Sequence, residues 1–405
     1  MKKILQSIGP GIVVAATGIG AGDMIAATVG GAKYGYLIIW AVVLGAVLKY
    51  VLNEGVGRWQ LVNNMSLAKA WIIYLPKFVA YYFLIYLLLW SFIVFAALMA
   101  ASGLAAYALT GMFSVKIWGG IHSVVALLLV LPGNYRYFEN IMKIIIAMMF
   151  VVVIASVVLL KPDFYLIAHG ILNPILPHDS VKYALAIIGG VGGSVTILSY
   201  GYWIKEKSWE GEEYLPKMKV DLALAYLLTG LFGIAVIIIA ADLKPEIVSG
   251  SGIVLALADK LGGLTGSAGR WIFLFGFWAA VFSSMIGVWQ GVPYIFADFT
   301  RQLKGDNPVE NNKQLSNAQA YRLFLLFMAI VPYVLLFMGK PVWLIIVYAV
   351  AGSLFMPFLA FTLLWLNNKK SLLKSKKNGI VINVLLIINL LLFLYLGIME
   401  LLKYI

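Results

Sequence analysis

Residues 9–23, GPGIVVAATGIGAGD, decide the fold: an apolar run is interrupted by glycines and ends in a carboxylate. Residues 189–196, GGVGGSVT, repeat this character further along the chain. Glycine destabilises a helix interior by about 1 kcal/mol relative to alanine, so each cluster indicates either an unwound segment or close packing of small residues. Two such clusters, five apolar spans apart, are typical of inverted repeats with discontinuous helices.

The composition around these stretches is that of a membrane protein. Of the 405 residues, 63% are hydrophobic and only 12% are charged, with a mean hydropathy of +0.96. Soluble domains are nearer half apolar and a quarter charged. The apolar runs are continuous and do not alternate with period two, which indicates membrane helices and not barrel strands.

Hydropathy predicts eleven spans, and no separate soluble domain between them. We place the spans at residues 7–30, 36–58, 78–102, 117–132, 141–160, 183–204, 220–241, 271–297, 321–338, 343–366 and 380–402. The predicted fold is therefore an all-α membrane protein with one transmembrane domain over residues 1–405. Residues 1–160 form a first repeat, 183–366 form an inverted second repeat, and 380–402 form an extra helix.

The distribution of basic residues predicts the orientation. About two thirds of the 30 lysines and arginines fall in loops on one side of the predicted spans. This excess explains the net charge of +13 without a nucleic-acid partner. We expect an integral protein of a prokaryotic plasma membrane, with the N-terminus in the cytoplasm and the C-terminus outside.

Several classes of chemistry have no support in the sequence. The chain has no cysteine, so disulfides, iron–sulfur clusters and thiolate metal sites are excluded. The three histidines, His122, His169 and His178, lack the paired spacing of a zinc site. No phosphate-binding loop, nucleophile elbow or metalloprotease helix is recognisable. We expect neither an enzyme nor a cofactor, and no obligatory protein partner is evident.

Asp23 is the strongest candidate for a site residue. It follows the glycines of the first span, where a charged group costs about 2.5–3.5 kcal/mol and should face a cavity or a partner. A carboxylate beside carbonyls freed at Gly20, Gly22 and Gly193 would suit a hard cation. The alternative is that Asp23 only caps the second half of a broken helix, although a cap does not exclude binding.

Two further charges lie within the second span. Lys49 either snorkels or is a fixed internal cation that pairs with Asp23 or Glu54 and contributes to coupling. Glu54 also lies four residues before Arg58, the spacing of an ordinary helical ion pair.

Hydroxyl groups offer additional oxygen ligands. Thr196 and Ser199 lie at the second glycine cluster, although such side chains in membrane helices usually bond to their own backbone. Ser283 and Ser284 in the eighth span either line an ion site or pack against a neighbouring helix.

These residues resemble the Nramp family of proton-coupled divalent-metal transporters. The similarity begins at residues 9–30 with Tyr34-Gly35-Tyr36 and Trp40, and it recurs in order along nearly the whole chain. Later matching segments are Asp221-Leu-Ala-Leu-Ala, Leu261-Gly262, Gly276, Ala279-Ala280, Ser283-Ser284 and Met356-Pro357-Phe358. The resemblance implies a LeuT-type fold of two five-helix inverted repeats plus one extra helix, with helices 1 and 6 broken.

The chain departs from the family at the metal site. The family's Asp-Pro-Gly-Asn matches residues 20–23, so its aspartate becomes Gly20 and its asparagine becomes Asp23. Its Met-Pro-His matches Thr196-Ile197-Leu198, which removes a soft thioether and a histidine. Phe355 replaces a glutamine, and the third span lacks the family's proton-pathway carboxylates.

Two functions are therefore open. The first is alternating-access transport of a divalent cation, with Mg²⁺ or Mn²⁺ favoured over softer metals and with weak or no proton coupling. Nramp-related magnesium transporters, which also lack the methionine, are similar in this respect. The second is transport of a small, amino-acid-like solute in a wider cavity lined by Tyr200, Tyr202 and Trp203.

Overall fold

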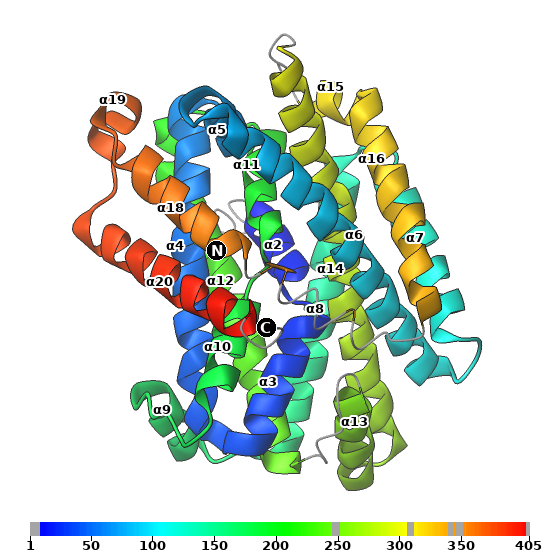
Figure 1. Ribbon diagram of the computed structural model, residues 1–405. Coiled ribbons are helices and arrows are strands. Elements are labelled where there is room, and N and C mark those ends of the chain that lie inside the picture. The colour runs from blue at the N-terminus through cyan, green and yellow to red at the C-terminus, as the bar shows by residue number, and fades with distance from the viewer. Residues whose placement is uncertain are drawn as a thin grey trace.

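The computed structural model describes residues 9–244, 252–305, 312–338, 344, 351–352 and 354–401, and within these ranges it contains helices and no strand (Figure 1). The α-helices are α2 Pro10–Gly18, α3 Ala21–Tyr34, α4 Ile39–Asn63, α5 Leu67–Tyr74, α6 Lys77–Thr110, α7 Val115–Val130, α8 Tyr135–Leu160, α9 Phe164–Leu172, α10 Val181–Gly190, α11 Ser199–Glu206, α12 Leu215–Leu243, α13 Gly252–Thr265, α14 Ser267–Lys304, α15 Asn312–Asn317, α16 Gln319–Ile330, α18 Phe355–Asn367, α19 Lys370–Leu373 and α20 Ile380–Leu401. The 3₁₀ segments are η1 Gly35–Ile38, η2 Val195–Leu198, η3 Glu212–Tyr214, η4 Val331–Met338 and η5 Lys374–Lys376.

Length and composition make these helices membrane-spanning elements. In the described part of the chain, eight helical segments are long and apolar enough to cross a bilayer, and α7 and α18 are shorter apolar helices. The predicted all-α membrane fold is confirmed, whereas the number of eleven spans stays a prediction. Residues 7 and 8 of the first predicted span, most of 343–354 and residue 402 lie outside the described residues.

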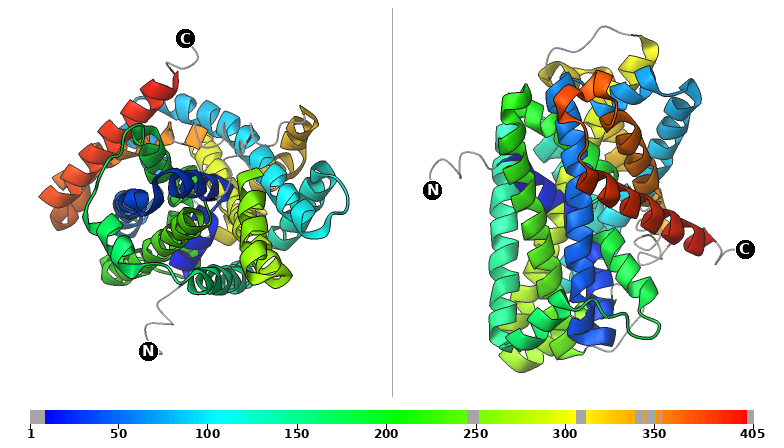
Figure 2. Two further views of the ribbon diagram at one scale, coloured as in Figure 1. Left: turned by 90° about the horizontal axis from the view of Figure 1, so that it is seen from below. Right: turned by 90° about the vertical axis from the view of Figure 1, so that its left-hand side faces the viewer.

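Burial separates central helices from peripheral ones. In its most apolar window α14 is 78% buried, whereas the corresponding window of α20 is 22% buried. Figure 2 shows α20, in red, at the edge of the bundle in the left view and across its near face in the right view. The predicted extra helix is thus a peripheral element, and α14 packs against α2, α6 and α8 in the interior.

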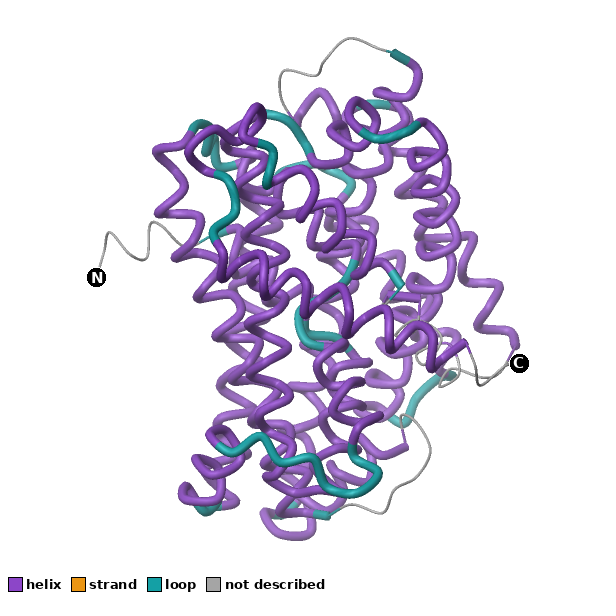
Figure 3. Tube along the Cα trace, turned by 60° about the vertical axis from the view of Figure 1, so that its left-hand side comes forward, coloured by secondary structure: helices purple, strands orange, loops and turns teal. Residues whose placement is uncertain are grey.

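The bundle has two distinct ends. Helices α5, α15 and α19 lie at one end, which we call the α5 end, and α9 and α13 lie at the other, the α9 end (Figure 1). Loops gather mainly at these ends, but short non-helical stretches also interrupt the interior (Figure 3). In a membrane such stretches occur only where protein or a cavity surrounds them.

Several connections expected to be loops contain helices, and α9 and α13 are two examples. Residues 161–182 include α9, whose first turn is capped by Asp163 Oδ1, 2.8 Å from the backbone nitrogen of Tyr165. Residues 242–270 include α13, which packs against α14. The hydropathy pattern did not predict these short helices because a local cap and tertiary packing stabilise them.

Candidate cation site

The first helix break separates α2 from α3. Helix α2 ends at Gly18, Ile19 and Gly20 are extended, and α3 begins at Ala21. Asp23 lies in the first turn of α3, and its Oδ2 accepts a hydrogen bond of 2.9 Å from the backbone nitrogen of Gly20. Gly20 is thus the N-cap residue, and Asp23 contributes to the cap from the third helical position with one of its two carboxylate oxygens.

The second break separates α10 from η2 and α11. Helix α10 ends at Gly190, and Gly192 and Gly193 have φ of +85° and +78° before η2 begins at Val195. These positive angles are strained for residues with a side chain, which explains the two glycines.

The two breaks lie against each other. A Cβ placed on Gly18 would lie 2.9 Å from the carbonyl carbon of Gly192, so the backbones touch. A Cβ on Gly190 would lie 2.9 Å from Asp23 Oδ1, the oxygen that the cap leaves free. Small residues thus bring the Asp23 carboxylate to the end of α10.

Lys49 reaches the second break from α4. Its side chain is buried, with 1% of the residue exposed, and Nζ donates a hydrogen bond to the carbonyl oxygen of Gly193. Glu54 instead pairs with Arg58 at 3.0 Å. Of the alternatives considered from the sequence, snorkelling is wrong for Lys49, and the Glu54–Arg58 pair is confirmed.

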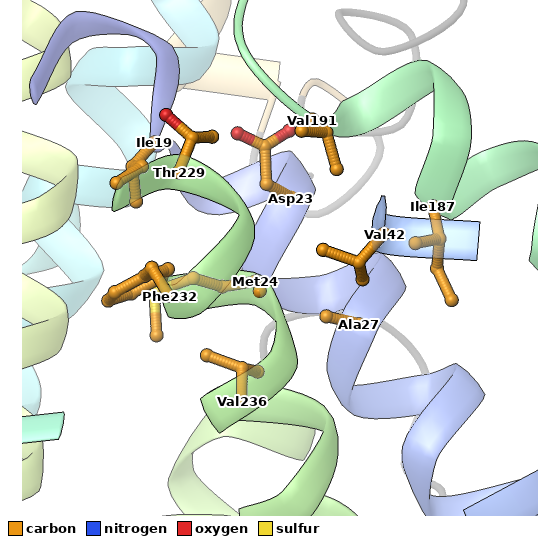
Figure 4. A pocket seen from close by; sticks show the side chains of 11 residues that line it. Ile19, Asp23, Met24, Ala27, Val42, Ile187, Val191, Thr229, Phe232 and Val236 are labelled. Atoms are coloured by element: carbon orange, nitrogen blue, oxygen red, sulfur yellow. The ribbon is translucent and has the colours of Figure 1, made fainter. Parts of the chain in front are cut away.

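A cavity adjoins Asp23 between α3, α4, α10 and α12. Its wall consists of Ile19, Asp23, Met24, Ala27, Val42, Ile187, Val191, Thr229, Phe232, Gly233 and Val236. Figure 4 shows the Asp23 carboxylate and the Thr229 hydroxyl at the same end of this cavity. Apart from these two groups and the Met24 thioether, its side chains are hydrocarbon, so a bound ion would rely on few ligands.

The remaining predicted ligands are distributed differently. Gly22 lies in the first turn of α3, and Thr196 lies beside Gly193, where a Cβ would be 2.6 Å from the threonine Oγ1. Ser199 Oγ is buried without a hydrogen-bond partner among the described residues and packs against Gly291. Neither hydroxyl lines the Asp23 cavity.

Ser283 and Ser284 join α14 to the end of α2. Ser283 Oγ donates to the carbonyl oxygen of Ala16 at 2.9 Å, and Ser284 Oγ donates to that of Thr17 at 2.8 Å. These bonds satisfy two carbonyls that the helix end leaves open. The packing role considered for these serines is therefore observed, and neither lines the Asp23 cavity.

The sequence analysis did not predict that Asp221 is a buried residue with a structural role. Its Oδ1 accepts a hydrogen bond from Gly9 N at 3.1 Å, and its Oδ2 accepts one from Gly11 N at 2.7 Å and one from Tyr200 OH at 3.0 Å. The carboxylate binds the N-terminus of α2, where unpaired N–H groups and the helix dipole favour an anion. The sequence identified it only as part of a family motif near the start of the predicted span 220–241.

Met24 and Thr229 were also missed at the cavity. Met24 directly follows Asp23, and Thr229 lies two turns into the apolar part of α12. Sequence alone gives neither residue an unusual context, because methionine and threonine are common on packed membrane helices. Only the meeting of α3 and α12 assigns them to the cavity wall.

A metal at this site would need backbone ligands. Among the described residues, no group of three or more histidine, aspartate and glutamate side chains comes together. His122 bonds to the Trp118 carbonyl and to Trp278 Nε1, while His178 contacts Asp179 on the surface. Asp23 is therefore the one carboxylate in the cavity wall, and Thr229 and Met24 supply the other heteroatom-bearing side chains there.

Comparison with curated proteins finds distant relatives that are divalent metal cation transporters. Divalent metal cation transporter MntH of Staphylococcus aureus is 24% identical over 220 residues, which are 53% of this chain and 47% of that protein. The alignment thus spans about half the length of these curated relatives.

Solved structures share the fold at low identity. A manganese transporter of Eremococcus coleocola superimposes with a TM-score of 0.82 at 18% identity, over 98% of this chain and 86% of that one. MhsT in complex with L-phenylalanine gives 0.60 at 15% identity, over 95% and 97% of the two chains. A nucleobase-cation-symport-1 family transporter gives 0.59 at 13% identity, over 96% and 91%.

A family model that matches almost the whole chain identifies the family to which the protein belongs. The model of the natural resistance-associated macrophage protein-like family, Nramp, covers residues 11–403, which include both helix breaks, Asp23 and the cavity. The chain is an integral membrane protein that belongs to the Nramp family.

Proposed function

We propose that this protein transports divalent metal cations across the membrane by alternating access. The observation that carries the proposal is the meeting of the two helix breaks at Asp23, whose Oδ1 faces the end of α10 beside a cavity. Membership of the Nramp family and the names of its metal-transporting relatives support the same substrate class.

Helix electrostatics favour a cation at this junction. Helices α2 and α10 both end there, and the C-terminus of a helix bears a partial negative charge on its unpaired carbonyls. The N-terminus of α3 also lies there, and Asp23 Oδ2 offsets it, so the preference for a cation rests on the two C-terminal helix ends and on Asp23 Oδ1. Oxygen ligands of this kind suit Mg²⁺ and Mn²⁺, and we propose these as the preferred ions.

The Met24 thioether reduces the expected preference of the site for hard ions. Loss of the family methionine at Thr196 removes one soft ligand, but Met24 puts a sulfur in the wall of the same cavity. The Met24 side chain lies further along the cavity than the Asp23 carboxylate (Figure 4). We therefore propose Mn²⁺ as the first ion to test and Mg²⁺ as the comparison.

The proposed architecture completes the mechanism. Eleven spans would form two inverted repeats of five, residues 1–160 and 183–366, with 380–402 as the extra helix. The breaks in helices 1 and 6 would let the half-helices move separately, so that the site opens to one side at a time. The excess of basic residues in loops on one side supports a cytoplasmic N-terminus and a C-terminus outside.

Proton coupling is proposed to be weak or absent. Helix α6 has no aspartate or glutamate along its length, and Glu139 in α8 is paired with Lys143 and Lys207. An internal acid that could relay a proton from the cavity is therefore lacking on α6. The expected result is that Mn²⁺ entry into proteoliposomes leaves the internal pH unchanged, and robust acidification would contradict this proposal.

No observation favours an organic solute. The three aromatic residues expected to line a wider cavity contact other groups: Tyr200 binds Asp221, Tyr202 binds Asp298, and Trp203 binds Gln290. None of the three lines the Asp23 cavity.

Uptake of Mn²⁺ into proteoliposomes tests the proposal. We expect saturable uptake by the unmutated protein and its loss in Asp23→Asn, which keeps the side-chain size but removes the charge. Asp163→Asn is the matched control, because Asp163 also caps a helix but lies at the exposed end of α9. Equal uptake by Asp23→Asn and the unmutated protein would reject the proposed site.

A further inference from the structure

Lys49 is a buried cation with an unusual partner. Its ammonium donates to the Gly193 carbonyl, a backbone oxygen freed by the break, and 1% of the residue is exposed. A buried ammonium is costly unless it is compensated, and an ammonium has three N–H groups to satisfy. The Phe393 ring, 5.6 Å away, adds a weak cation–π contact.

The charge that compensates Lys49 comes from the first break. The Asp23 carboxylate lies against the end of α10 at Gly190, three residues before the Gly193 carbonyl that Lys49 binds. Glu54, on the same helix as Lys49, is neutralised by Arg58. Among the described residues, the junction of the breaks therefore contains one negative and one positive side chain.

We propose that Lys49 is a tethered cation that replaces the transported ion at the junction. In this role it holds the Gly193 carbonyl and offsets Asp23 when the metal has left, and it releases that carbonyl when a metal binds. The inference rests on the proposed function, because it concerns how the same site works in a transport cycle.

Alternating access explains why Lys49 would have to replace the transported ion. A carrier must close around its site both with cargo and without it, and an unpaired carboxylate in the closed bundle is strongly unfavourable. Lys49 supplies a charge that stays with the protein, so the unloaded carrier closes around a neutral pair. Lysine suits this task, since its flexible four-carbon stem lets the ammonium move away from Gly193.

The same charge opposes the cargo. A divalent ion beside Asp23 is repelled by a nearby ammonium, and the repulsion is stronger in a bundle interior than in water. Lys49 therefore weakens metal binding and at the same time promotes return of the unloaded carrier. A residue with only a structural role would not produce both effects.

Binding of Mn²⁺ to the purified full-length protein tests the first effect. Lys49→Met should lower the Kd for Mn²⁺ about ten-fold or more, because it removes the competing charge. Lys49→Arg should keep the original Kd within a few-fold. Asn389→Leu is the matched control, because Asn389 Nδ2 also donates from a buried side chain to an α4 carbonyl, that of Leu48, at 3.0 Å.

Net uptake and exchange test the second effect in proteoliposomes. Net Mn²⁺ uptake requires the unloaded carrier to return, whereas exchange of internal for external Mn²⁺ does not. Lys49→Met should slow net uptake about ten-fold and leave exchange within about two-fold of the unmutated protein. Equal loss of both activities, or loss of neither, would overturn the proposal.

The outcomes separate this inference from the function on which it rests. An unchanged or higher Kd in folded Lys49→Met, with normal binding by the unmutated protein, overturns the role of Lys49 alone. Absence of Mn²⁺ binding by every folded variant overturns the proposed function. If Lys49→Met does not fold, Lys49→Gln supplies an uncharged side chain of similar length that retains a donor for Gly193.

Discussion

The two helix breaks differ in how they are built. The α2/α3 break is extended, with Gly20 at φ −129° and ψ −178°, and it brings its own carboxylate, Asp23. The α10/η2 break depends on Gly192 and Gly193 at positive φ and contains no charged side chain; its positive charge reaches it from α4 through Lys49.

The two breaks therefore contribute different groups to the site, a side chain at the first break and backbone carbonyls at the second. At the first break the functional property is a side chain, and the backbone there adopts a conformation open to any residue. At the second break the functional property is the exposed backbone, and two glycines are the condition for it. Substitutions of the glycines at positive φ should therefore affect stability most, and substitutions that displace the Asp23 carboxylate should affect cation binding most.

The largest expected effect is on stability at Gly192. Gly192→Ala should lower the free energy of unfolding by about 3 kcal/mol, because a Cβ at φ +85° would lie 2.6 Å from Tyr226 Cε1. Gly20→Ala, at an extended φ, should cost less than about 1 kcal/mol. Thermal unfolding of both variants measures the contrast, and equal destabilisation would contradict it.

The next effect is on transport at Gly190. Gly190→Ala puts a methyl group 2.9 Å from Asp23 Oδ1, so the carboxylate must turn away from the end of α10. We expect the KM for Mn²⁺ uptake to rise about ten-fold, with about 1 kcal/mol lost in stability.

Gly189→Ala is the matched control for this change. A Cβ at Gly189 meets Phe393 Cε1 at 3.4 Å, an ordinary contact, and does not approach Asp23. Its KM should stay within about two-fold of the unmutated value. A similar rise in both variants would show that the α10 backbone, and not the Asp23 contact, determines affinity.

A smaller effect is expected at the α14 contact with α2. Ser283→Ala or Ser284→Ala should each lower stability by about 1 kcal/mol, because a carbonyl of α2 loses its donor. The Kd for Mn²⁺ should not change. Ser102→Ala is the control, since Ser102 Oγ has no hydrogen-bond partner among the described residues. A large loss of Mn²⁺ affinity in either α14 variant would place an ion site there.

The smallest effect concerns the choice of metal. Met24→Leu preserves volume and should change stability by less than about 1 kcal/mol. If the thioether contributes a soft ligand, the variant should lose a few-fold in Cd²⁺ affinity relative to Mn²⁺. Competition of Cd²⁺ against Mn²⁺ uptake measures this ratio, and an unchanged ratio would show that the sulfur serves packing alone.

Much of the fold was predictable because membranes restrict the choice of structure. Continuous apolar runs of span length must form helices, since unpaired backbone groups cannot remain in hydrocarbon. The glycine clusters at residues 18–22 and 189–193 also marked where helices end. The short helices α9 and α13 were not predictable, because a cap and tertiary packing stabilise them.

The candidate site was predictable only in part. Asp23 and Lys49 stood out because charge is rare in apolar spans, and both lie at the junction of the breaks. The carbonyl that Lys49 contacts lies 144 residues away in sequence, and no local pattern encodes that pairing. Asp221 was recognised only as part of a family motif, because its partners, Gly9 and Gly11, lie 212 and 210 residues away in the sequence.

The sequence by itself determined that the chain is a bundle of membrane helices, which spans contain glycine clusters, and which buried charges need partners. These properties depend on local composition and on the energy of placing charge or glycine in a membrane helix. The tertiary structure decided that the breaks touch, that Lys49 binds Gly193, and that Met24 and Thr229 share a cavity with Asp23. Those contacts join distant segments, and the packing of whole helices, not any local preference, sets their geometry.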